Sequence, residues 1–87
     1  MKILIHADGR TLSGTPTQIT QQMQSLAFAA QGLSLSDYVD WAAKMAHDML
    51  GVQLDIEGET DDSKAASLLN AMLQTGLADE LEEELVN

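Results

Sequence analysis

The sequence predicts a small α+β domain of element order ββααβα, in which helices cover one face of a three-stranded sheet of strand order 2-1-3. Apolar residues recur with the period of a helix over residues 37–50, and they alternate with polar residues over 52–57. Near the start of the chain, Asp8 and Gly9 separate two short extended stretches, which is typical of a β-hairpin. These patterns together indicate a hairpin, a set of helices and one further strand.

The hairpin supplies the first two strands. Residues 2–6 contain a short apolar run and are predicted as the first strand, and residues 11–13 as the second. The second strand is brief and polar, as expected at the edge of a sheet, and Gly14 ends it.

A first helix is predicted directly after the hairpin. Thr15 is the expected N-cap, Pro16 takes the first helical position, and Gln18 completes a capping box. The helix carries apolar residues on one side, and Gly32 is expected to end it. Phe28 lies about 180° from that apolar side. This position indicates an irregular helix end, a second covered face or an exposed ring.

The second helix, residues 37–50, has the strongest apolar pattern in the chain. Ser34 and Ser36 are alternative N-caps, and Gly51 ends the helix. The apolar side chains fill an arc of roughly 200°, which predicts contacts with both the sheet and another helix. The arc consists of Tyr38, Val39, Trp41, Ala42, Ala43, Met45, Ala46, Met49 and Leu50.

The third strand is predicted over residues 52–57, where Val52, Leu54 and Ile56 alternate with polar residues. A pair of helices returns the chain to its starting end, so this strand is expected beside the first strand and parallel to it.

A third helix is predicted from an N-cap at Thr60 to Gly76. The domain is therefore expected to span residues 1–78. Residues 79–87 are expected to form an acidic tail or a short helix.

The composition indicates one small domain. The chain has 87 residues and no cysteine, which leaves no structural disulfide and no thiolate metal site. The apolar run at residues 2–5 is too short for a signal peptide, and no apolar stretch is long enough to span a membrane. These features favour a cytoplasmic protein.

The formal net charge of −10 lies almost entirely in the C-terminal part. Residues 1–54 carry four acidic and three basic residues, whereas residues 55–87 carry ten acidic residues and a single basic one, Lys64. This imbalance disfavours direct contact with nucleic acid or an anionic membrane, and it suits a basic protein partner.

The acidic part has three interpretations. It can be a solvated surface that keeps a small domain soluble, a docking surface for a basic partner, or a mimic of nucleic acid whose carboxylates stand in for phosphates. Asp55, Glu57 and Glu59 are the candidate interface residues: the carboxylates of Asp55 and Glu57 lie on one face of the expected strand, and Glu59 follows in the turn after it.

The sequence gives little indication of catalysis or metal binding. His6, Asp8 and His47 lie at the ends of elements and lack the spacing of helical metal sites. The acidic run from Asp55 departs from a calcium loop, because Gly58 falls at its fourth position instead of its sixth. We therefore expect no enzyme, no metal site and no cofactor.

Phe28 and Trp41 are the apolar residues best placed for an interface. Trp41 lies at the edge of its arc, where burial within the chain is the simpler interpretation, and Phe28 lies off its own apolar face. The chain has only three aromatic residues, and so thin a core is often strengthened by a homodimer contact. The sequence thus predicts a non-enzymatic protein–protein interaction or regulatory module. A nucleic-acid-mimicking inhibitor is the alternative.

Overall fold

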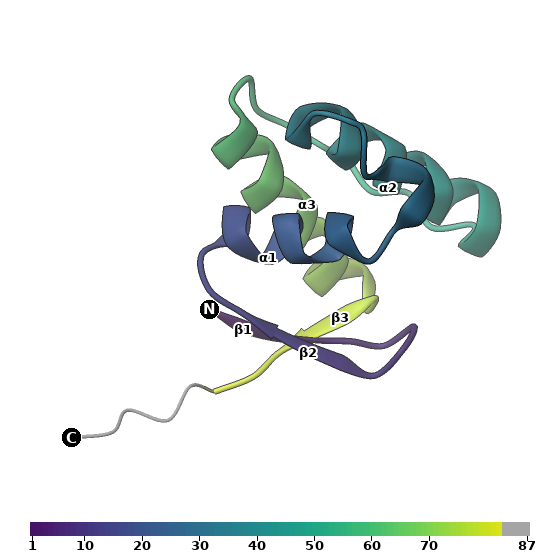
Figure 1. Cartoon of the computed structure of the whole chain (residues 1–87). Coiled ribbons are helices and arrows are strands. Elements are labelled where there is room, and N and C mark those ends of the chain that lie inside the picture. Colours follow the sequence, from purple (N-terminus) through teal and green to yellow (C-terminus); the bar gives the residue numbers. More distant parts are fainter. Residues whose placement is uncertain (83–87) are drawn as a thin grey trace.

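A computed structural model of the chain describes residues 1–82. Within this range, three short strands form a sheet, and three helices lie together on one face of it (Figure 1). The strands are β1 (Lys2–Ile5), β2 (Arg10–Ser13) and β3 (Ala78–Glu80). The helices are α1 (Pro16–Ser25), α2 (Leu35–Leu50) and α3 (Asp61–Thr75), and a short 3-10 helix, η1, spans Phe28–Ala30. The predicted α+β class is confirmed.

The sheet has the predicted order β2-β1-β3, with both neighbouring pairs antiparallel. Ile3 in the central strand lies opposite Leu12 of β2 and Glu80 of β3. The N–H of Leu81 donates to the carbonyl of Lys2 at 2.8 Å, which extends the ladder one residue past β3. Ile3 is fully buried, so the helices cover the face of the sheet that carries it.

The segment that supplies the third strand differs from the prediction. Residues 52–57 belong to no strand; β3 follows α3 and runs antiparallel to β1, not parallel. Its residues carry no alternating apolar pattern, and only Ala78 is buried. Pairing with the free edge of β1 gives this segment its strand structure, which is a tertiary effect that local pattern does not contain.

The predicted C-terminal tail is partly contradicted by the same finding. Asp79 and Glu80 lie in the sheet and pair with β1, so they start no short helix. Residues 83–87 of that tail lie outside the described residues.

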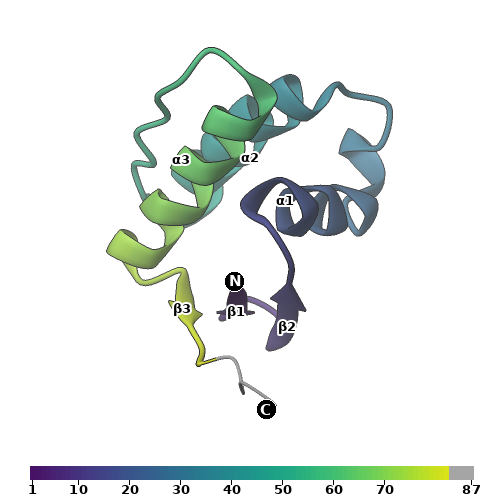
Figure 2. The same cartoon turned by 90° about the vertical axis from the view of Figure 1, so that its left-hand side faces the viewer.

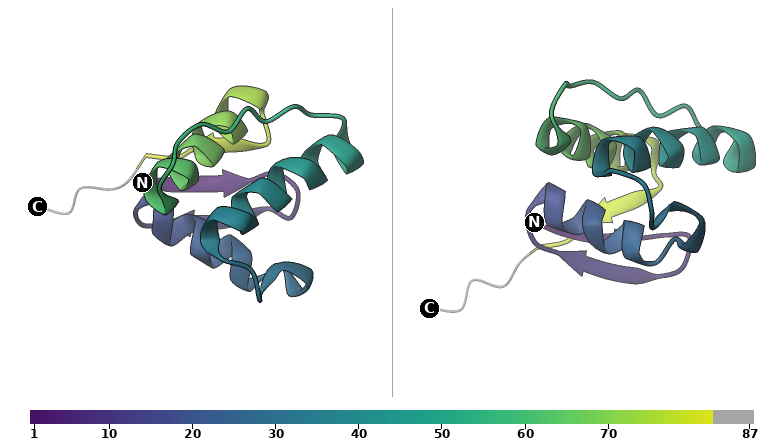
Figure 3. Two further views of the ribbon diagram at one scale, coloured as in Figure 1. Left: turned by 90° about the horizontal axis from the view of Figure 1, so that it is seen from above. Right: turned by 45° about the horizontal axis from the view of Figure 1, so that its top comes forward.

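The connection between α2 and α3, residues 51–60, is an extended return along the helices. The two helices lie side by side and run in the same direction in all the cartoons (Figures 1 and 2). The chain must therefore travel back over the length of α2, about 24 Å for a helix of this size. Ten residues reach about 33–36 Å when fully extended, so a largely extended chain covers that distance, and Figure 3 shows the connection as a long open trace. We call residues 52–57 the extended segment.

The extended segment keeps the alternation predicted for a strand. Leu54 is 5% exposed, and Val52 and Ile56 pack partly against the core, whereas Gln53, Asp55 and Glu57 are exposed. The sequence therefore identified its conformation and its buried face correctly, but not its lack of a strand partner.

The helix ends follow the sequence signals closely. Thr15 caps α1 in a complete capping box, and the N-cap of α2 is Ser34, not Ser36. Thr60 caps α3. Gly51 and Gly76 end α2 and α3 with positive φ angles of 68° and 80°, a conformation that glycine adopts without strain.

The core lies between the helices and the inner face of the sheet. Its largest fully buried side chains are Ile3, Ile19, Leu68, Leu69, Val39 and Thr20.

In α2, the predicted apolar arc is too long, because Met49 and Leu50 are 72% and 59% exposed on the last turn of the helix. Within the described part of the chain, the helices are too short or too polar to cross a membrane.

Candidate functional site

Phe28 lies on the outside of the turn that connects α1 to α2. The first helix ends at Ser25, earlier than the sequence predicts, and residues 28–30 form η1. Ala30 in this turn is fully buried, whereas Phe28 is 91% exposed. Two of the sequence alternatives, the irregular helix end and the exposed ring, are therefore both observed.

Glutamine side chains hold this turn in place. The Nε2 of Gln24 donates to the carbonyls of Ala30 at 2.9 Å and of Leu33 at 2.8 Å. On the other side, the Nε2 of Gln31 donates to the carbonyl of Ser25 at 2.8 Å. These bonds tie both ends of the turn to α1, so the exposure of its aromatic ring is a property of the folded backbone.

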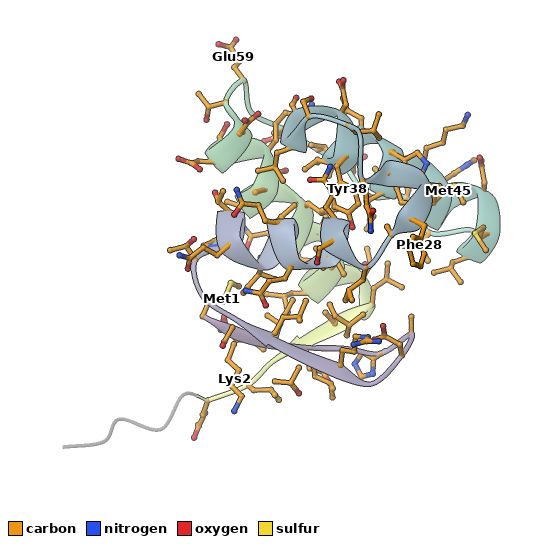
Figure 4. All side chains as sticks on the ribbon, viewed as in Figure 1. Met1, Lys2, Phe28, Tyr38, Met45 and Glu59 are labelled. Atoms are coloured by element: carbon orange, nitrogen blue, oxygen red, sulfur yellow. The ribbon has the colours of Figure 1, made fainter. Side chains whose placement is uncertain are left out.

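Two further apolar side chains near this turn in the sequence are partly exposed. Leu26 and Leu33 are 47% and 38% exposed. We call Leu26, Phe28 and Leu33 the Phe28 surface, and Figure 4 shows the Phe28 ring at the periphery of the helical layer. Burying a phenylalanine side chain is worth about 1.5–3 kcal/mol, and the domain itself leaves this contribution unused.

Trp41 does not belong to the Phe28 surface. Its ring stacks on that of Tyr38, with centroids 5.9 Å apart and planes inclined by 29°, and it packs half-buried against the core. Burial also raises the pKa of Tyr38 to about 12. Trp41 thus serves the core, and the two aromatic residues proposed together from sequence occupy different environments.

Asp55 and Glu57 line a groove of about 780 Å³ between the extended segment and α3. The helical wall of this groove consists of small or polar residues, namely Ser63, Ala66, Ser67, Asn70, Ala71, Gln74 and Thr75. We call it the α3 groove. Glu59 does not line the groove; it stands at the tip of the turn before α3 and points away from the domain (Figure 4).

Ser67 joins the extended segment to α3. Its hydroxyl accepts a hydrogen bond from the N–H of Glu57 at 2.8 Å and makes a longer contact of 3.4 Å to the carbonyl of Asp55. The groups of Asp55 and Glu57 that bond to Ser67 therefore face α3.

The carboxylates of this region have no cationic partner within residues 1–82. Lys64, the single basic residue after position 54, donates from Nζ to Asp40 and to Ser36, each at 2.8 Å. Those bonds join α3 to the start of α2 and leave the negative charge of Asp55 and Glu57 uncompensated by a salt bridge.

The histidines lie in separate places. The Nε2 of His6 is 3.0 Å from Asp79, across β1 and β3, and the Nδ1 of His47 is 3.3 Å from its neighbour Asp48. Among the described residues, no three His, Cys, Asp or Glu side chains gather as metal ligands do.

Sequence reasoning did not identify the helical wall of the groove. Ser67, Asn70 and Gln74 form the polar side of α3, and such a stripe normally faces solvent. Their spacing of three and four residues showed only that they share a face. The groove exists because the extended segment returns beside that face, and the sequence does not show this return.

The fold and these surfaces define a small α+β domain with two candidate binding regions. Comparison with protein-family models, curated proteins and solved structures finds no match for the chain.

Proposed function

We propose that the chain is a non-enzymatic protein–protein interaction or regulatory module that binds a partner protein through the Phe28 surface. The observation that supports this proposal is the 91% exposure of Phe28 on a hydrogen-bonded turn. A large ring held outward by a fixed backbone loses little conformational freedom when a partner covers it.

The chemistry of the surface suits protein recognition. Aromatic residues are enriched among the side chains that dominate binding energies, above all where neighbouring apolar groups exclude water. Leu26 and Leu33 can supply such a border. The proposal includes a cytoplasmic location and, as one form of the partner, a second copy of the chain.

Nucleic-acid mimicry is the second candidate function. It is supported by the exposed acidic side chains of Asp55, Glu57 and Glu59, which have no salt-bridge partner among residues 1–82. A protein bound to these carboxylates in place of phosphates is expected to dissociate as ionic strength rises.

Affinity capture with matched variants tests both candidates. The wild-type chain, Phe28→Ser and Met49→Ser are immobilised at equal density and exposed to lysate of the native host, with and without nuclease, at low and high salt. Met49 is the matched control, because it is 72% exposed but lies on the last turn of α2. Light scattering of each variant measures self-association separately.

The proposal predicts a partner that tolerates high salt, binds Met49→Ser and is lost with Phe28→Ser. If the partner is a second copy, the wild type and Met49→Ser are dimers and Phe28→Ser is a monomer. A partner released by salt and competed by DNA supports mimicry. Equal capture by the wild type and Phe28→Ser would contradict the Phe28 surface as the binding site.

A further inference from the structure

We propose that the α3 groove binds a positively charged peptide segment of a partner protein, which adds as a β-strand along the backbone of the extended segment. This inference is independent of the Phe28 surface, because the two regions share no residue. It rests on the direction of backbone groups, the shape of the groove wall and the charge at its rim.

The backbone of the extended segment presents one edge to α3. In an extended chain, the N–H and C=O of a residue point to the same edge, and those of the next residue point to the opposite edge. The C=O of Asp55 and the N–H of Glu57 contact Ser67. The N–H of Asp55, the C=O of Glu57 and both backbone groups of Gln53 therefore lie on the same edge, which faces α3.

Most of these groups have no partner. Within residues 1–82, nothing accepts a hydrogen bond from the N–H of Gln53 or Asp55, and nothing donates to the carbonyls of Gln53 or Glu57. Alternating free donors and acceptors along an extended chain are the groups that a neighbouring strand pairs with. Ser67 already occupies the C=O of Asp55 and the N–H of Glu57, so the added strand pairs with the free groups that precede this bridge, the N–H and C=O of Gln53 and the N–H of Asp55.

The opposite wall allows a peptide main chain to approach. Apart from Gln74, the residues of α3 that line the groove have side chains no larger than asparagine. The groove volume of about 780 Å³ lies within the range of sites that bind small ligands. In one recurring mode of peptide recognition, an extended peptide adds as a strand to an exposed backbone edge of a sheet; here the edge belongs to an extended segment outside the sheet.

The rim defines the chemistry of the peptide. Asp55 and Glu57 are exposed on the outer face of the extended segment and have no salt bridge within residues 1–82. Successive side chains of an added strand alternate between the rim and the groove floor. The expected ligand therefore carries Lys or Arg at every second position, for the carboxylates, and small apolar residues between them.

The test uses a short fluorescein-labelled peptide in which Lys alternates with Val. A second peptide has Glu in place of Lys. A third keeps the side chains of the first but carries N-methyl groups on alternate backbone amides, so that it cannot form a strand ladder. Fluorescence anisotropy measures the affinity of each, and amide NMR spectra of the full chain locate the contact.

The protein variants separate the two components of binding. Asn70→Trp fills the groove without changing charge, and circular dichroism verifies its fold. Asp55→Asn with Glu57→Gln removes the rim charge. The matched control, Asp37→Asn with Asp48→Asn, removes the same charge from exposed positions of α2 outside the groove.

We expect the Lys–Val peptide to bind and to shift the amide signals of Gln53 and Asp55. The N-methylated and Glu-containing peptides should bind at least about tenfold more weakly, since they lose the main-chain bonds or the charge pairing. The rim variant should lose about two- to fivefold in affinity per charge, and Asn70→Trp should abolish binding. The matched control and Phe28→Ser should bind as the wild type does.

Equal binding of the N-methylated peptide, or NMR shifts confined to other elements, would overturn the strand-addition proposal, as would no binding at all. Equal losses in the matched control would reduce the interaction to net charge and overturn it as well. Because Phe28→Ser is expected to be silent here, failure of this proposal and failure of the Phe28 surface are distinguishable.

Discussion

Replacing Leu54 with alanine tests whether the extended segment is a fixed part of the core. Leu54 is 5% exposed and belongs to the main hydrophobic cluster. Truncating a buried leucine costs about 2–5 kcal/mol, depending on how far the surroundings close the cavity. The segment has few backbone hydrogen bonds and can settle inward, so we expect the lower end, about 2–3 kcal/mol.

Urea unfolding followed by the fluorescence of Trp41 measures this change, because Trp41 is the single tryptophan and packs against the core. The matched control is Gln53→Ala, whose side chain is on the exposed face and whose loss should stay within about 0.5 kcal/mol. A loss below about 1 kcal/mol for Leu54→Ala, or equal losses at both positions, would refute the alternating burial.

Three further changes test other parts of the structure. Ser67→Ala should cost about 1 kcal/mol and speed hydrogen exchange at the Glu57 amide; unchanged exchange would argue against the bridge. A Cβ at Gly58, where φ is 114°, would clash with the side chain of Ser63, so Gly58→Ala should cost about 1–3 kcal/mol in thermal unfolding, and a neutral result would contradict this turn. Burial raises the pKa of Tyr38 from 10.0 to about 12. Because the unfolded chain loses this proton at lower pH than the folded chain does, the contribution of Tyr38 to the free energy of unfolding should be fully present below about pH 10 and be lost as the pH rises toward 12. Tyr38→Phe should remove that fall, and an ordinary pKa in an absorbance titration of this single tyrosine would contradict the burial.

The features that the sequence predicted correctly are those set by neighbouring residues. The capping box at Thr15, the cap at Thr60 and the glycines that end α2 and α3 each depend on a few adjacent positions. The alternation around Leu54 likewise shows which side chains of an extended chain are buried. It does not show whether another strand pairs with that chain.

The features that the sequence missed depend on how elements pack. Residues 78–80 become a strand because β1 has a free edge beside them, and the extended segment stays unpaired because it returns beside helices. Phe28 could not be placed while the helix was assumed to continue past Ser25. In the candidate interface, Asp55 and Glu57 do share a groove, but its helical wall at Ser67 emerged only from the structure.

Both the fold and the α3 groove depend on the extended segment having an open backbone edge. Amide hydrogen exchange of the free chain, resolved by NMR, measures this most directly. We expect fast exchange at Gln53 and Asp55, slower exchange at Glu57, and protection at Leu81, whose N–H bonds to β1. Protected amides at Gln53 and Asp55 together with fast exchange at Leu81 would contradict the open edge of the extended segment, because the third strand would then be residues 52–57.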